Sequence, residues 1–187
     1  MAKNLSLSKY FLIFFIALIF LCFDLRMGSF NFLPDALGYL LFALTMGAFA
    51  QFPAMKKARL LAFLLIPLSA LDFYQLGGDS LLFSLIDLGA LLISTALGLL
   101  FIRLLLSGIA ACLGRMNAPD DLKRFCSGCW LPILFSQVLY LALYTLCVFL
   151  PDLAIFAAIA GVIRLVMQVL LLTLLFRTYR LAKEAEA

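Results

Sequence analysis

Histidine is absent from this sequence, and its absence removes several kinds of chemistry at once. A chain with no His lacks the imidazole used in Ser-His-Asp triads, in most general acid–base mechanisms and in His-ligated metal and haem sites. Charged residues are also scarce, at 13% of the chain. Carboxylates could still act as acids or bases, but no nucleophile is arranged beside them. The sequence therefore points to no enzyme, and it predicts no metal and no cofactor.

Hydrophobic residues dominate what remains. They make up 66% of the 187 residues, and the mean hydropathy is +1.17, which is typical of integral membrane proteins. A spanning helix needs about 20 mostly apolar residues. Too little chain is left for a soluble domain, so residues 1–187 are expected to form a single polytopic membrane domain. The expected spans lie at roughly 9–27, 35–53, 58–76, 81–106, 130–150 and 153–176.

The basic residues predict how these spans are threaded. Lys and Arg accumulate in short cytoplasmic loops, and with a cytoplasmic N-terminus every Lys and Arg except Arg26 and Arg164 falls on that side. We therefore expect an all-α membrane protein with six transmembrane helices and both termini cytoplasmic. The helices form three hairpins, at roughly 9–53, 58–106 and 130–176. The net charge of +4 reflects this topology and does not indicate nucleic acid as a partner.

An internal repeat supports the hairpin interpretation. The stretches LGYLLFALTMG (37–47) and LGALLISTALG (88–98) share the same glycine spacing. Small residues allow helices in lipid to approach closely. Gly47 and Gly98 are therefore expected to face neighbouring helices, and Ala157 with Gly161 forms a similar pair in the third hairpin.

The motif FLPD occurs twice, at 32–35 and 149–152. Pro fits the first turn of a helix because it has no N–H to lose, and Asp there complements the positive end of the helix dipole. Both copies are therefore interpreted as helix starts at the outer interface.

Ionisable residues inside the apolar segments are the strongest functional signal. Asp87 lies about 9 Å inside the fourth expected span, and Arg164 lies near the bilayer midplane. Charges at such depth are costly unless they are paired or solvated. Arg164 is expected to pair with Asp87 or Asp72, and Gln168 and Gln137 would continue a polar strip. Asp24, Asp35, Asp72, Asp79, Asp87 and Asp152 all map to the outer half.

The cysteine pair Cys126 and Cys129 has the spacing of a thiol–disulfide motif or of half a zinc site. Its expected position is cytoplasmic, where thiols stay reduced. A zinc site would need two further ligands, and only Cys112 is near. We interpret the pair as ordinary interfacial cysteines beside Trp130, with redox or metal chemistry as the alternative.

The stretch GSFNFLPDALGYLLFAL resembles the first hairpin of small uncharacterised integral membrane proteins of Gram-positive bacteria, in which an LPD-x-x-GY turn opens a helix. That resemblance implies a bacterial inner-membrane protein and supplies no activity. More weakly, the size and helix number are similar to the substrate-binding subunits of energy-coupling vitamin transporters. This second resemblance implies a small-solute ligand and a partner membrane or ATPase subunit.

Two functions remain open from the sequence. The first is binding or transport of a small solute or cation through an outward-facing acidic cavity. The second is a structural or partner-binding membrane subunit whose buried charges only fix the packing of the helices. The candidate site residues are Asp24, Asp35, Asp72, Asp87, Arg164 and Gln168.

Overall fold

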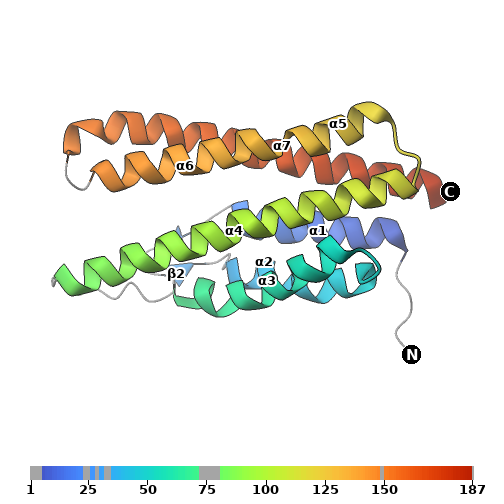
Figure 1. Ribbon diagram of the computed structural model, residues 1–187, viewed down its shortest axis with the longest axis horizontal. Helices are drawn as coiled ribbons and strands as arrows, with labels where there is room; N and C mark the ends of the chain where they lie inside the picture. The colour runs from blue at the N-terminus through green and yellow to red at the C-terminus, as the bar shows by residue number, and fades with distance from the viewer. Residues whose placement is uncertain are drawn as a thin grey trace.

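The computed structural model describes residues 6–22, 26–27, 30–31, 35–71, 81–147 and 150–186, with side chains described except at 26–27, 30–31, 70–71, 81–88 and 151. Apart from one short β-ladder, the regular elements of these residues are helical (Figure 1), which confirms the predicted helical class. The elements are α1 (Leu7–Cys22), β1 (Arg26–Met27), β2 (Phe30–Asn31), α2 (Asp35–Thr45), the 3-10 turn η1 (Met46–Phe49), α3 (Pro53–Leu71), α4 (Leu81–Arg115), α5 (Asp120–Gly128), α6 (Trp130–Cys147), the 3-10 turn η2 (Pro151–Leu153) and α7 (Ala154–Glu186). β1 and β2 pair antiparallel, with Arg26 opposite Asn31.

Among the described residues, three helical stretches are long and apolar enough to cross a membrane. They are Gly89–Arg115, Asp120–Cys147 and Ala154–Glu186. At 1.5 Å per residue, the 33 residues of α7 extend for about 50 Å, which exceeds the roughly 30 Å of bilayer hydrocarbon. Large apolar side chains on α7 are exposed, such as Ile155 at 71%. This pattern suits a lipid environment.

The second helix is shorter than the expected 35–53 segment, for reasons that are local. The Thr45 hydroxyl donates to the Leu41 carbonyl at 2.6 Å, a bond that favours a bend in a helix. The chain then tightens into η1, and Pro53 starts α3 earlier than the expected residue 58. Arg59 donates from Nε to the Ala43 carbonyl at 2.9 Å, which satisfies an acceptor near the end of α2.

The fourth helix is longer than expected, and it ends in a defined cap. It continues past the predicted residue 106 to Arg115. Asn117 has φ 49°, the Ala118 N–H donates to the Leu113 carbonyl at 3.0 Å, and the Asn117 N–H donates to Gly114 at 3.4 Å. These two bonds are those of a Schellman motif. Pro119 then leads directly into α5.

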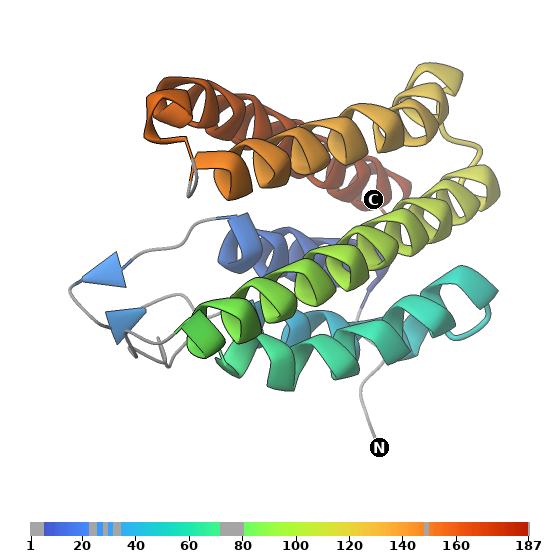
Figure 2. The same cartoon turned by 60° about the vertical axis from the view of Figure 1, so that its left-hand side comes forward.

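Consecutive helices pack as neighbours, α1 with α2, α3 with α4, and α6 with α7. The most extensive contact joins α1 to α7, so the first and last long helices lie side by side. Figures 1 and 2 show the α6–α7 pair as one layer above α1 and α4, with α2 and α3 beneath. By contrast, α4 and α6 touch over only a short stretch.

Aromatic residues fill the core near the end of the molecule where the termini lie. Phe14 packs on Phe42 with ring centroids 5.3 Å apart, and Phe42 packs on Phe101 at 5.2 Å. Phe11, Phe14 and Leu18 recur at helical spacing on one face of α1, and all three are buried. The sequence pattern of α1 therefore builds the centre of the core.

The glycines of the repeat are not equivalent in space. Gly47 and Gly98 do face neighbouring helices, since a Cβ would lie 3.4 Å from the Arg59 guanidinium and 3.7 Å from the Tyr39 hydroxyl. Gly38 packs more tightly, with a Cβ position only 2.8 Å from the Ala17 carbonyl oxygen, whereas its repeat partner Gly89 has no atom of the described residues within 4 Å of its Cβ position. The similar sequences therefore serve different packing roles.

Candidate functional site

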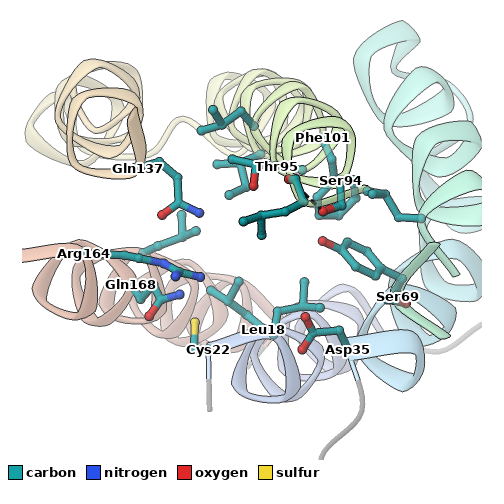
Figure 3. A pocket seen from close by; sticks show the side chains of 18 residues that line it. Leu18, Cys22, Asp35, Ser69, Ser94, Thr95, Phe101, Gln137, Arg164 and Gln168 are labelled. Atoms are coloured by element: carbon teal, nitrogen blue, oxygen red, sulfur yellow. Dashed lines mark hydrogen bonds between the residues drawn. The ribbon is translucent and has the colours of Figure 1, made fainter. Parts of the chain in front are cut away.

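A cavity of about 200 Å³ lies between the α6–α7 layer and the helices beneath it. Figure 3 shows its walls, which come from α1, α2, α3, α4 and α7, with Gln137 alone from α6. Its lining includes many polar side chains, although 66% of the chain is hydrophobic. The polar lining residues are Asp35, Tyr39, Ser69, Ser94, Thr95, Gln137, Arg164 and Gln168.

Arg164 is the only lining residue, among those described, that carries a positive charge. It lies about 15 Å into α7 from Ala154, which is half the depth of a bilayer. Its guanidinium carbon lies 4.9 Å from the ring centroid of Tyr140 on α6. Its Nε is buried, and no described residue provides a hydrogen-bond acceptor for it. A buried donor without an acceptor costs about 1–3 kcal/mol, and more on a charged group.

Two amide side chains lie beside Arg164. Gln168 follows it by one helical turn on α7, so both side chains share a face, and Gln137 comes from α6. Figure 3 shows the ends of the three side chains gathered on one side of the cavity. The group offers several N–H donors in one place.

Asp35 reaches the cavity from the first turn of α2. The close approach of α2 to α1 at Gly38 brings this turn against the wall made by Cys22. In Figure 3, Asp35 and Arg164 lie on different sides of the cavity. The two opposite charges therefore line one cavity from different helices.

The α4 wall is made mostly of small and hydroxyl side chains. The Ser94 hydroxyl donates to the Leu91 carbonyl at 3.1 Å, and Thr95 and Gly98 also line the cavity. Because Gly98 has no side chain, space is left in front of Tyr39. A larger residue at 98 would occupy the cavity.

The structure brings together three of the predicted site residues, namely Asp35, Arg164 and Gln168. Asp24 and Asp72 lie outside the described residues, and of Asp87 only the backbone, within α4, is described. The expected pairing of Arg164 with Asp87 or Asp72 thus stays a prediction. Among described residues, no carboxylate forms an ion pair with Arg164, and its contact is the Tyr140 ring.

Sequence reasoning missed Tyr140, Tyr39, Ser94 and Thr95. Tyr140 follows Gln137 by three residues on α6, a spacing that places both on one helix face. That spacing was a usable signal. Ser94 and Thr95 gave no comparable signal, because a hydroxyl in an apolar helix usually bonds to its own backbone.

The cysteine pair lies away from the cavity, and both members are buried. The Cys126 thiol donates to the Leu106 carbonyl at 3.4 Å, which ties α5 to α4. Within the described part of the chain, no group of three His, Cys, Asp or Glu side chains is placed to hold a metal ion. In the part of the chain that the structure describes, Cys126 and Cys129 therefore have a packing role.

Comparison of the chain with protein-family models, with curated proteins and with solved structures gives no match.

Proposed function

We propose that this chain is a multi-pass protein of a bacterial inner membrane with six crossings and both termini in the cytoplasm. The contact of α1 with α7 supports this, because it places the two ends of the chain on one side. The Ser8 N–H and hydroxyl donate to the Glu186 carboxylate at 3.0 and 2.6 Å. Protease added outside intact cells should leave the end near Lys183 uncut and should cut it in inverted vesicles. Cleavage in intact cells would reject this topology.

Its function, on this proposal, is to bind a small polar solute in the cavity beneath the α6–α7 layer. One observation carries it: Arg164 lies in the wall of a polar cavity, about 15 Å along α7 from Ala154, with a buried Nε that no described residue satisfies. An arginine whose only role was to lock the helices would be expected to have its donors satisfied by the protein. An arginine that receives a ligand or water keeps them available.

The test measures whether water reaches the cavity, by comparing the labelling of cysteines placed at two adjacent residues of α4. All five native cysteines are first replaced by Ala or Ser, and a cysteine is then introduced at Ser94 or at Ile93. Ser94 lines the cavity, whereas Ile93 is 57% exposed beside it and would face lipid. A membrane-impermeant thiol reagent should label Ser94→Cys and spare Ile93→Cys, because only a thiol in contact with water forms the reactive thiolate.

The outcomes separate the two functions left open by the sequence. Protection of both cysteines in folded protein would mean that the cavity is dry and that its charges only fix the packing of the helices. Labelling of both would mean that this part of α4 is not embedded in lipid. Either result would reject solute binding as stated.

A further inference from the structure

We propose that the ligand of this cavity carries an anionic group, a carboxylate or a phosphate, which binds the guanidinium of Arg164. This inference rests on the proposed function, since it requires a cavity that a ligand can enter. It adds the chemical class of the ligand and the part of the site that recognises it.

The charge of Arg164 makes an anion the natural partner. A guanidinium stays protonated in proteins, so burial cannot make it neutral as it can a lysine. In the described residues Arg164 has no ion pair, and its charge is met only by the Tyr140 ring at 4.9 Å. A cation–π contact compensates a buried charge only in part. An incoming anion that reaches the guanidinium from the cavity would supply the missing charge.

The geometry also controls how the anion would approach. The Tyr140 ring covers one face of the guanidinium, so an acceptor would meet the N–H edge rather than the face. Carboxylate and phosphate oxygens match that edge because they can accept two parallel N–H bonds. The amides of Gln137 and Gln168 lie on the same side of the cavity (Figure 3) and can donate to the same oxygens.

Asp35 limits the charge of the ligand. It lines the same cavity from α2, away from the Arg164 side. A ligand with negative groups at both ends would place one of them near this carboxylate. A single anionic group with a neutral or cationic remainder fits the distribution of charge better.

Two sources could supply such a group, a lipid headgroup and a free anion in water. α4 and α6 touch only briefly, and Leu91, which lines the cavity, is 37% exposed. A lipid headgroup could enter sideways there, and a free carboxylate or phosphate could enter from water. The recognised chemistry is the same, so the two sources are separated by experiment.

The experiment measures thermal unfolding of the purified full-length chain in a nonionic detergent with two sets of probes. The first adds phosphatidylglycerol to the micelle, compared with an uncharged diacylglycerol of equal chain length. The second adds sodium phosphate or acetate, compared with sodium chloride at equal ionic strength. A ligand that binds only the folded state raises the unfolding midpoint. A rise with phosphatidylglycerol alone identifies a headgroup, and a rise with phosphate or acetate identifies a free anion.

The variants test whether the effect belongs to Arg164. Arg164→Met should abolish the rise, and Arg164→Lys should keep only part of it because the bidentate edge is lost. Arg103→Met is the matched control, because Arg103 also stacks on an aromatic ring, that of Trp130 at 5.7 Å, but does not line the cavity. It should keep the full rise. If Arg164→Met does not fold, Gln137→Leu serves instead and should weaken apparent affinity by about tenfold, the loss of one hydrogen bond to a charged group.

The inference is overturned if neither probe set raises the unfolding midpoint of the wild type. It is also overturned if Arg103→Met loses as much of the ligand-induced rise as Arg164→Met does. Labelling at Ser94→Cys keeps these failures distinct. A labelled cavity with no response to anions rejects the anionic ligand alone. An unlabelled cavity rejects the proposed function itself.

Discussion

At the scale of single residues, the sequence identifies Arg164 but not what surrounds it. A lone arginine in an apolar run stands out because of its cost in lipid, and Gln168 follows from helical spacing. Tyr140 could not be paired with Arg164 in advance, since their contact depends on how α6 and α7 lie against each other. The ring also rests on Gly161, where a Cβ would lie 3.5 Å away. One aromatic side chain therefore supports both the arginine and the α6–α7 packing.

Truncation of Tyr140 should show how much the ring contributes to the site. Tyr140→Leu removes the cation–π contact and should lower the stability of the folded protein by about 0.5–2 kcal/mol. Tyr140→Phe keeps the ring and should behave like wild type in thermal unfolding. Tyr144 stacks on Tyr140 with centroids 5.9 Å apart, but the ring that Arg164 contacts is that of Tyr140, so Tyr144→Leu is the control. Equal losses in Tyr140→Leu and Tyr144→Leu would contradict a specific role for Arg164 stacking.

Gly108 is a second residue whose role emerges only in three dimensions. A Cβ there would lie 2.5 Å from Cγ of Met55, which is fully buried on α3. Gly108→Ala should therefore destabilise the protein by about 1–3 kcal/mol through overpacking. Gly89→Ala, in the same helix with nothing within 4 Å, should be neutral or slightly stabilising. Thermal midpoints of the two variants decide the point, and equal midpoints would mean that α3 and α4 are not packed so closely.

At the scale of helices, ends marked by proline were predictable and other ends were not. Pro34 and Asp35 correctly predicted the start of α2, and Asp152 of the second FLPD motif lies in the 3-10 turn η2 that leads into α7. Near the end of α2, Arg59 reaches across from α3 to donate to the Ala43 carbonyl. No pattern within α2 carries that information. The extension of α4 to Arg115 was not predicted, because hydropathy marks the apolar segment and not the cap at Asn117 that ends the helix.

The cap at the end of α4 gives a test at this scale. Asn117 is exposed, with φ 49°, a left-handed conformation that Gly adopts freely and β-branched residues resist. Asn117→Gly should leave the thermal midpoint unchanged or raise it. Asn117→Val should lower stability by about 1–2 kcal/mol. If valine were tolerated as well as glycine, the turn between α4 and α5 would differ from the one described.

At the scale of the whole molecule, the contact between α1 and α7 closes the arrangement of helices. Hydropathy and charge predicted hairpins of consecutive helices, but they carry no information about which hairpins adjoin. The structure places α1 between α2 and α7, which leaves α4 and α6 as the weakly joined pair. The cavity and the short α4–α6 contact beside it both follow from that order. They were therefore beyond reach of the sequence, although Asp35, Arg164 and Gln168 were not.

Glu186 holds this closure at the ends of the chain. Its carboxylate accepts from the backbone N–H and hydroxyl of Ser8 at the start of α1, as an N-capping group does. Glu186→Gln should lower the thermal midpoint because the charge at the helix N-terminus is lost. Glu184→Gln is the matched control, since Glu184 makes only an exposed 4.0 Å pair with Arg180. Identical midpoints for the two variants would show that the cap does not join α1 to α7.

The central claim is that Arg164 faces a hydrated cavity and receives a ligand there. The most direct measurement is a high-resolution structure of the full chain in lipid nanodiscs, examined for non-protein density around Arg164. The account predicts density within hydrogen-bonding distance of the Arg164 guanidinium, which remains stacked on Tyr140. A closed cavity, with Arg164 in an ion pair with a carboxylate of its own chain such as Asp87, would contradict it.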